Sequence, residues 1–565
     1  MSRTRADEID SLRQNAHFDV MVVGGGINGI GVYRELALQG LRVLLVERND
    51  FCSGCSSAPS RMIHGGLRYL ENGEVSLVRE SLAERDNLLR NAPHLVHPLP
   101  TTVPAASRFS GIFNAAAGFF GAKGKPKPRG IVPIRLGLTL YDLLTRRNRL
   151  LPRHRAHSQV ETRRLWPDLT PDARWSATYF DAWVSHPERL GLELILDTAS
   201  AAPQSIALNY AEVAPGPEGF RLTEQVSGET LTVTAKLVVN ASGAWVDQTA
   251  RSLGASGQKR LVSGTKGSHL ILDNPALYKA LNGHMIFFEN ADGRVCITFP
   301  YLGRVLAGST DIRVETPGRT RCEAEEMDYI LTSLRGVFPA IGLDPSQILF
   351  SYSGVRPLPV SDHDFTGRIS RGHFTQRIDG PVPQICMVGG KWTTFRAFAA
   401  QVADEALAEL GAPRLRQTDD LAIGGGHDHP GEDELTSALQ TRFDLKPDRA
   451  RHLAQTYGSR AFNLLAGGAT EEPLSLNCPL SRQELHWILR HERVLHLSDL
   501  LLRRSDLAIT GWLDARMISA AAALMAEEFG WDDTRREAEI SSLTDELARF
   551  HGVAPETLIS RNERT

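Results

Sequence analysis

The stretch that decides the fold is Phe18-Asp19-Val20-Met21-Val22-Val23-Gly24-Gly25-Gly26-Ile27-Asn28-Gly29-Ile30, near the start of a chain of 565 residues. An apolar run leads directly into the pattern G-x-G-x-x-G, at Gly24, Gly26 and Gly29. The first glycine allows a tight turn, the second lets the backbone approach a pyrophosphate, and the third lets the following helix pack closely on the strand. The free N–H groups at the start of that helix would point at the phosphates. This stretch therefore predicts a strand, a turn and a helix that bind a dinucleotide.

A second apolar run strengthens this prediction. Leu41-Arg42-Val43-Leu44-Leu45-Val46-Glu47 reads as a strand that ends in a carboxylate, about 20 residues after the glycines. Glu47 is therefore predicted to accept hydrogen bonds from a ribose. An acid at this point favours an unphosphorylated ribose, and hence FAD or NAD rather than NADP.

Length and composition limit the functions to consider. A chain of this length predicts two or three domains, and 42% hydrophobic with 23% charged residues is typical of a soluble globular protein. The net charge of -3 gives no overall attraction to nucleic acid, so no nucleic-acid partner is expected. Residues 1–17 lack the apolar stretch of a signal peptide, and no apolar run reaches about 18 residues. We expect a cytoplasmic protein, peripherally bound to the inner membrane face if it touches a membrane.

The cysteines and histidines do not predict a metal site. Six cysteines in this length argue against a disulfide scaffold and for a reducing compartment. Cys52 and Cys55 form a C-x-x-C, which is either a redox dithiol or a pair of small residues in a tight loop. Zinc would need a second such pair, and the other cysteines are isolated. His427 and His429 have no accompanying cluster of acids or cysteines.

A second informative stretch follows the nucleotide-binding unit. A loop of small residues from Ser53 to Ser60 leads into Arg61-Met62-Ile63-His64-Gly65-Gly66-Leu67-Arg68-Tyr69-Leu70. The serines can bind phosphates or ribityl hydroxyls, and the glycine pair lets the backbone lie close to a flat ring. His64, Arg68 and Tyr69 supply an acid/base, a cation and a hydroxyl. Because the stretch directly follows the glycine turn, we interpret it as part of the site rather than as core.

From Ser60 to Glu71 the sequence resembles the signature of the FAD-dependent glycerol-3-phosphate dehydrogenases, the quinone-linked family. Other stretches that resemble the family are Arg135-Leu136-Gly137-Leu138 with Tyr141-Asp142, Lys266-Gly267-Ser268-His269, Gly308-Ser309-Thr310-Asp311, Tyr352-Ser353-Gly354-Val355-Arg356-Pro357-Leu358 and Gly389-Gly390-Lys391-Trp392-Thr393-Thr394-Phe395-Arg396. The resemblance spans most of the chain. Its motifs are specific to the family and less specific to the exact substrate.

The resemblance implies an α/β fold: a Rossmann-like FAD-binding domain interleaved with a mixed or antiparallel substrate sheet, plus a C-terminal all-α domain. We expect a polar N-terminal extension over residues 1–17, an FAD-dependent oxidoreductase region over 18–415 and a helical domain over 425–565. FAD-binding segments are expected at about 18–100, 190–265 and 350–415, with substrate segments between them. In the helical part, Ser481-x-x-Glu484 predicts a capping box, and Val494 to Arg504 is expected to continue the helix.

The resemblance also implies a reaction, the oxidation of sn-glycerol 3-phosphate to dihydroxyacetone phosphate, with hydride passing to flavin N5 and electrons to membrane quinone. Such a reaction needs a base for the hydroxyl proton and fixed cations for the phosphate. The base candidates are His64 and His269. The predicted catalytic residues are His64, Arg68, Tyr69, His269, Arg356 and Lys391, and the predicted phosphate ligands are Arg68, Arg356, Arg371 and Lys391. Predicted FAD contacts are Gly24, Gly26, Asn28, Gly29, Glu47, Ser56, Ser57, Ser60, His64, Gly65, Gly66, Gly243, Gly389, Gly390, Lys391, Trp392 and Thr393.

Three alternatives stay open at this point. The substrate could be a longer polyol phosphate such as erythritol phosphate, and the electron acceptor could be oxygen, as in an oxidase. The stretch Ser185-His186-Pro187-Glu188 departs from the acids usual in the family and indicates a different pocket wall. A flavin-bearing sensor without turnover is the third alternative, and the retention of His64, Arg68, Arg356 and Lys391 argues against it. The C-terminal helices are a candidate surface for a homodimer.

Residues 105–130 are predicted to contact a membrane. Apolar residues recur there at helical spacing on one face, at Phe109, Ile112, Phe113, Ala116, Phe119 and Phe120, followed by the cations Lys123, Lys125, Lys127 and Arg129. The run is too short to span a bilayer, but an apolar face beside a basic tail suits a helix that lies on anionic lipid. The alternative is a surface loop that packs on its own domain.

Overall fold

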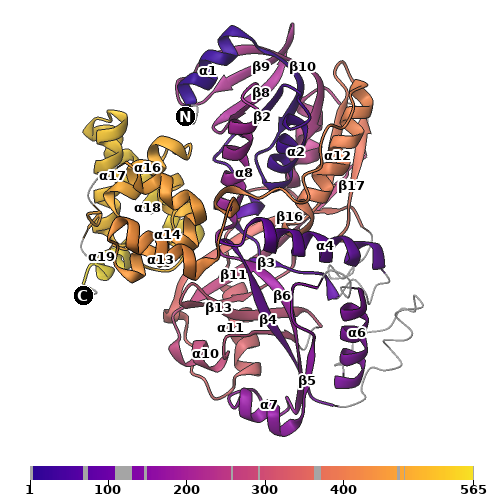
Figure 1. Ribbon diagram of the computed structural model, residues 1–565, viewed down its shortest axis with the longest axis vertical. Helices are drawn as coiled ribbons and strands as arrows, with labels where there is room; N and C mark the ends of the chain where they lie inside the picture. Colours follow the sequence, from indigo (N-terminus) through magenta and orange to yellow (C-terminus); the bar gives the residue numbers. More distant parts are fainter. Residues whose placement is uncertain are drawn as a thin grey trace.

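Figure 1 shows the computed structural model. It describes residues 4–67, 74–107, 130–144, 149–255, 259–290, 293–361, 371–467, 471–475 and 478–563. The fold contains two β-sheets, whose strands alternate along the chain, with helices on their faces and a group of helices at the C-terminus (Figure 1).

The predicted strand, turn and helix lie at the centre of the first sheet. β1 (His17–Val23) runs parallel to β2 (Val43–Val46) on one side and to β10 (Thr230–Asn240) on the other. The full order is β17 (His373–Ile378), β18 (Gln384–Gly389), β10, β1, β2 and β7 (Ile206–Leu208), with the hairpin of β8 (Ala211–Gly216) and β9 (Gly219–Glu224) paired to β10. β17 is antiparallel to β18 and closes that edge.

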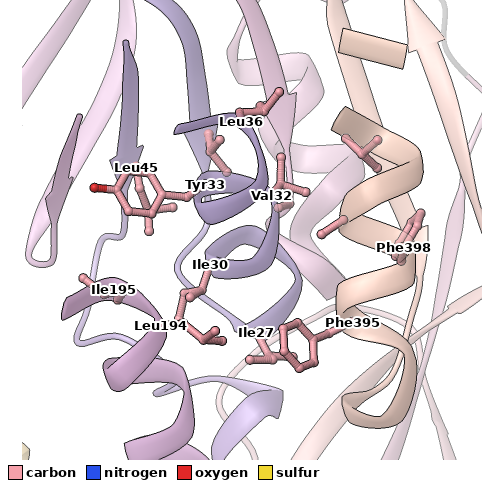
Figure 2. Close-up of a cluster of buried hydrophobic side chains, with 14 of the residues drawn as sticks. Ile27, Ile30, Val32, Tyr33, Leu36, Leu45, Leu194, Ile195, Phe395 and Phe398 are labelled. Carbon is pink, nitrogen blue, oxygen red and sulfur yellow. The ribbon is translucent and has the colours of Figure 1, made fainter. Parts of the chain in front are cut away.

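Both faces of this sheet are covered, as its uninterrupted apolar strands require. On one face lie α2 (Ile27–Ala37), α8 (Pro187–Ala201) and α12 (Phe395–Leu410), and Figure 2 shows Ile30, Leu45, Leu194 and Phe395 in the shared core. On the other face, Leu12 packs with Met21 and Leu44. Leu12 belongs to α1 (Arg5–Gln14), so the polar N-terminal extension forms a helix that packs on the sheet.

The second sheet combines segments from three parts of the chain. Its order is β15 (Ile312–Val314), β11 (Val262–Leu272), β14 (Arg304–Gly308), β13 (Val295–Tyr301), β12 (Met285–Glu289), β4 (Val96–Ala105), β6 (Trp175–Val184) and β3 (Met62–Ile63), with β16 (Ile348–Pro359) paired to β11 and β5 (Arg155–His157) to β6. β4 and β12 are parallel, whereas β11 and β16 are antiparallel. The sheet is therefore mixed, as expected.

Helices cover this sheet and its junction with the first. α10 (Pro275–Ala280) and α11 (Ala324–Val337) share a core with one face of the second sheet. α4 (Val75–Asn91) lies where the two sheets meet, and α6 (Ile131–Leu144) lies at the outer edge of the molecule (Figure 1). Shorter helices are α7 (Gln159–Leu165) and α9 (Val246–Ser252). Within the described ranges, none of the helices combines the length and apolar character needed to cross a membrane.

The C-terminal helices are α13 (Glu432–Phe443), α14 (Pro447–Tyr457), α15 (Ala461–Leu465), α16 (Arg482–His491), α17 (Ala515–Phe529), α18 (Asp533–His551) and α19 (Pro555–Arg561). The last four of them pack on the other face of the second sheet, whereas α13, α14 and α15 form a core of their own against Trp487 of α16. Leu485 of α16 and Met525 of α17 share one core with Phe299 and Tyr352 of the sheet. The C-terminal helices are thus continuous with the sheet rather than separated by a linker.

Two local predictions in this part are wrong. Ser481 accepts a hydrogen bond from the Glu484 N–H, but the Glu484 carboxylate binds Arg449 and Tyr457 rather than reaching back, so half of the capping box forms. The helix also does not continue to Arg504. α16 ends at His491, and a separate π-helical turn, η8 (Asp499–Arg504), follows it. The carboxylate of Asp499, the first residue of η8, accepts hydrogen bonds from the N–H groups of Leu495 and His496.

Candidate active site

The glycine turn after β1 has the geometry that its sequence predicts. Gly24 has φ +112°, a region that favours glycine, and a Cβ there would lie 2.7 Å from the Ala241 carbonyl oxygen. A Cβ on Gly29 would lie 1.9 Å from the Gly24 carbonyl oxygen, so α2 packs on the turn at a distance that excludes a side chain. The turn therefore presents bare backbone at the start of α2.

Glu47 and the small-residue loop hold this turn. The two Glu47 carboxylate oxygens accept hydrogen bonds from the Gly25 N–H (2.7 Å) and the Asn49 N–H (2.8 Å), while burial raises the pKa of this carboxyl. Ser56 Oγ accepts from the Ile27 N–H at 3.0 Å. Ser57 Oγ donates to a carbonyl of its own loop, and Ser60 is half-buried.

The segment after β18 joins the same place. Trp392 Nε1 donates to the Ser56 carbonyl at 3.1 Å, and Asn28 Nδ2 donates to the Gly389 carbonyl at 3.3 Å. A Cβ on Gly390, where φ is +90°, would lie 2.4 Å from Asn28 Nδ2. Three stretches far apart in sequence are thus bonded together. Gly243, with φ +61°, begins the turn after β10, and this turn adjoins the glycine turn, since a Cβ on Gly24 would lie 2.9 Å from the Ser242 Cα.

His64, Gly65 and Gly66 run past the Gly389–Thr393 segment. The His64 N–H donates to Thr393 Oγ1 at 3.2 Å, and Gly66 has φ +78°. The Gly65 N–H donates to Asp181 at 2.9 Å. The same Asp181 oxygen accepts from the Tyr141 hydroxyl at 2.6 Å and from Arg85 at 3.3 Å.

The predicted phosphate cations Arg356 and Arg371 lie together on one carboxylate. Arg356 reaches Asp311 at 3.2 Å and Ser309 Oγ at 3.2 Å, and Arg371 reaches the other Asp311 oxygen at 3.3 Å. Gly267 makes room for Arg356, because a Cβ there would lie 1.8 Å from its Nη2. Burial, together with the charge of Arg371, lowers the pKa of Arg356.

His269 lies on β11 two residues after Gly267. Neither of its ring nitrogens has a hydrogen-bond partner among the described residues, although the side chain is buried. The ring stacks on Tyr352 with centroids 5.0 Å apart. Burial, and then the charges of Arg356 and Arg61, lower the pKa of His269 to about 3. The imidazole is therefore neutral at neutral pH.

Lys391 directly follows the glycine pair Gly389–Gly390 and begins the turn Trp392–Thr394. Its Nζ donates to Ser81 Oγ on α4 at 2.9 Å. Burial lowers its pKa to about 7, against the opposing charges of Glu80 and Glu74, and the charge of Arg371 adds to the lowering. The charges of Lys391 and Arg371 therefore influence each other, although Lys391 follows the glycine pair and Arg371 binds Asp311.

Comparisons with known proteins identify the family. Residues 19–404 match the family model described as FAD dependent oxidoreductase, and residues 416–536 match the C-terminal domain of alpha-glycerophosphate oxidase. The chain is 33% identical to a glycerol-3-phosphate dehydrogenase from Synechocystis sp., over 93% of this chain and 96% of that one. The chain belongs to the FAD-dependent glycerol-3-phosphate dehydrogenase family. The resemblance noted in the sequence is thereby confirmed.

Two further relatives add to this assignment. The chain is 31% identical to D-erythritol 1-phosphate dehydrogenase from Brucella abortus, over 86% of this chain and 94% of that one. The crystal structure of glycerol-3-phosphate dehydrogenase from Bacillus halodurans, complexed with FAD, matches 95% of this chain and 96% of that chain with a TM-score of 0.74 at 23% identity. The expected fold class and the FAD cofactor are confirmed.

The residues of this family member fit FAD. The bare turn at Gly24 and the positive φ angles at Gly389 and Gly390 leave backbone close to where a ligand would approach. Asn28 Oδ1 is buried, with no partner in the part of the chain that the structure describes, and is an acceptor for a ligand hydroxyl. The roles of the individual residues remain predictions.

The redox interpretation of Cys52 and Cys55 gains no support. Cys52 and Cys55 are free thiols, and burial raises the pKa of both. A raised pKa disfavours the thiolate that redox exchange requires. The described residues also contain no group of three or more His, Cys, Asp or Glu side chains placed to hold a metal ion.

Some predicted site residues cannot be placed, and two that matter were not predicted. Arg68, Tyr69 and most of the proposed membrane segment, residues 108–129, lie outside the described residues. Asp181 and Asp311 emerge from the structure as the carboxylates that hold Gly65 and the arginine pair. Asp311 ends the Gly308–Asp311 motif that the sequence singled out, and Asp181 lies four residues before Ser185–Glu188, the stretch that departs from the family.

Proposed function

We propose that this chain oxidises the secondary alcohol of sn-glycerol 3-phosphate, giving dihydroxyacetone phosphate. The observation that carries the proposal is the pair of arginines, Arg356 and Arg371, held on Asp311 near His269, whose ring nitrogens have no partner among the described residues. Bound FAD supplies the hydride acceptor for this chemistry. The protein's own residues bind the phosphate, orient the alcohol and take its proton.

The arginine pair suits a phosphate because its charge is only partly balanced. Among the described residues, the salt bridges of the two guanidinium groups go to the one carboxylate of Asp311, so two positive charges face one negative charge on a partly buried surface. A lowered pKa at Arg356 means that its charge lacks full compensation, so an anion beside it would be stabilised. Lys391 adds a third cation when it is protonated. Arginine is favoured for this role because its fork matches phosphate oxygens.

We assign proton acceptance to His64 and hydrogen-bond acceptance to His269. A general base works best when its pKa lies near the operating pH, and a pKa of about 3 makes His269 a weak base. A neutral His269 still offers a ring nitrogen that has no partner among the residues the structure describes and that can orient the substrate hydroxyl. His64 lies on the segment bonded to Thr393, next to the glycine pair that is predicted to face the flavin.

Anaerobic stopped-flow measurement of flavin bleaching tests the proposal. sn-Glycerol 3-phosphate should bleach the flavin, whereas glycerol, which lacks the phosphate, should not at the same concentration. D-Erythritol phosphate is the comparison substrate, because the relative from Brucella abortus is nearly as similar as the one from Synechocystis sp.. Faster bleaching by the four-carbon substrate would replace glycerol 3-phosphate with a tetritol phosphate, and no bleaching by either would refute the assignment.

We further propose that the reduced enzyme gives its electrons to membrane quinone and binds the inner membrane face. α6, which follows the predicted membrane segment directly, exposes four apolar side chains at helical spacing. They are Val132, Leu136, Leu140 and Leu143. An apolar face of this kind, which follows the basic residues at 123–129 in the sequence, suits a bilayer with anionic headgroups. A homodimer remains a prediction.

A further inference from the structure

Two arginines near the end of the chain bind the loop that holds the glycine turn. Asp50 lies three residues after Glu47 and is fully buried. Arg504 donates to both of its oxygens, at 2.8 and 2.9 Å, and Arg503 Nε donates to one of them at 2.6 Å. Asn209 completes the set at 3.0 Å. A buried carboxylate is thus fully satisfied by two guanidinium groups that come from the C-terminal helical region.

The π-helical turn η8 places these two arginines. Arg503 and Arg504 end the turn, and Asp499 begins it. Arg503 also donates to Asp499 at 2.6 Å, and the Tyr210 hydroxyl donates to the same Asp499 oxygen at 2.6 Å. The turn is therefore fixed at both ends. π-Helical turns are rare and occur frequently at functional sites.

The loop carrying Asp50 is bonded to the glycine turn on both sides of Asp50. Before it, the Glu47 carboxylate accepts the Gly25 N–H at 2.7 Å. After it, the Cys52 N–H donates to the Gly25 carbonyl at 2.9 Å. Gly25 has little freedom in between, because a Cβ on it would lie 2.7 Å from the Glu47 Cβ and 2.8 Å from the Phe51 ring. A shift of Asp50 would therefore pass directly to the turn that faces the FAD phosphates.

We propose that Arg503 and Arg504 are positioning residues for FAD, which act through Asp50 on the glycine turn. The C-terminal helical region then has a role in holding the cofactor, although the residues that touch FAD are predicted elsewhere. This role depends on the FAD cofactor of the family and is independent of which polyol phosphate is oxidised.

The chain offers a matched control in a second buried ion pair between the same two regions. Arg189 of α8 donates to both oxygens of Glu492, at 2.8 and 3.0 Å, and the Glu492 side chain is fully buried. Among the described residues, the side-chain hydrogen bonds of this pair reach the Arg504 carbonyl, at 3.3 Å, but neither the Asp50 carboxylate nor the rest of the loop from Glu47 to Ser60. Asp50→Asn and Glu492→Gln thus remove the same charge from equally buried carboxylates, but only the Asp50 carboxylate belongs to the loop that holds the glycine turn.

The experiment measures FAD release and global stability of the holoenzyme. Each variant is diluted into FAD-free buffer, and the rise of free-flavin fluorescence gives the release rate. Urea unfolding at saturating FAD gives the stability of each variant. Asp50→Asn should release FAD at least tenfold faster than wild type, and Glu492→Gln should stay within about twofold while losing a similar amount of stability. At saturating FAD, turnover of Asp50→Asn should return to near the wild-type value.

Two results would overturn the proposal: equal acceleration of FAD release in both variants, or unchanged release in Asp50→Asn. If Asp50→Asn does not accumulate as folded protein, the milder pair Arg504→Lys and Arg189→Lys repeats the comparison, since each arginine grips its carboxylate through two hydrogen bonds. Faster release in Arg504→Lys alone supports the positioning role, and equal release in the two lysine variants refutes it.

Discussion

Replacing Gly267 with alanine should weaken substrate binding without touching FAD. The new Cβ would lie 1.8 Å from Arg356 Nη2 and 2.2 Å from Cζ. Since non-bonded contacts need about 3.5 Å, the guanidinium must move by roughly 1.7 Å. That shift is enough to break its hydrogen bonds to Ser309 and Asp311, both 3.2 Å long. Arg356 would then no longer be aligned with the substrate phosphate.

The expected loss follows from the kind of contact removed. Losing one partner of a buried, hydrogen-bonded charge pair costs about 2–5 kcal/mol. At about 1.4 kcal/mol per tenfold, the substrate concentration for half-maximal flavin reduction should rise about 30-fold or more. Anaerobic titration of flavin absorbance with sn-glycerol 3-phosphate measures this value, and the unchanged spectrum before substrate is added shows that FAD is retained.

Gly264→Ala is the matched control on the same strand. A Cβ on Gly264 would meet a methyl group of Val355 at 2.7 Å. Val355 and Arg356 are adjacent on β16 and so point to opposite faces. This variant should therefore lose stability but keep substrate affinity. The reasoning fails if Gly267→Ala binds substrate like wild type, or if it weakens binding by a further large factor in an Arg356→Ala background, where no guanidinium is left to displace.

Three further predictions concern pH, the membrane and the core. Lys391 carries its charge below its pKa of about 7, so kcat/KM should fall as the pH rises through 7. Lys391→Met should abolish this fall and should lower the affinity for substrate at pH 6. A pH profile like that of the wild type would argue against Lys391 as a phosphate ligand. Leu136→Glu with Leu143→Glu should reduce flotation with anionic liposomes. Ile559→Glu, which changes an equally exposed residue on α19, should not reduce it. Equal flotation of the double variant and the Ile559→Glu variant would leave α6 without a membrane role. Phe398→Ala removes a buried ring from the core in Figure 2 and should lower the free energy of unfolding, measured by urea titration, by about 3–5 kcal/mol. A loss below about 1 kcal/mol would show that the surrounding side chains fill the cavity.

The sequence predicted the local parts of the fold well because each depends on neighbouring residues. An apolar run followed by glycines at fixed spacing allows β1, the turn and α2 and little else. Leu485 and Ile488 lie on the buried side of α16, as the helical pattern indicates. The predictions that were wrong involve residues whose partners come from elsewhere. Glu484 has the right spacing for a capping box, but Arg449, from α14, captures its carboxylate.

The sequence by itself determined which chemistry is available, and the tertiary structure decided which residues share it. The glycine turn and Glu47 could be identified from their types and spacing, because backbone conformation and side-chain chemistry are local properties, and the arginines could be identified from the stretches that resemble the family. Nothing local indicates that Asp50 is bound by Arg504, 454 residues away. Such pairs form when packed elements bring buried charges together, since an unpaired buried charge is strongly unfavourable. The partner of a buried charge is therefore set by how the two sheets and the C-terminal helices pack, and no single stretch of the chain determines that packing.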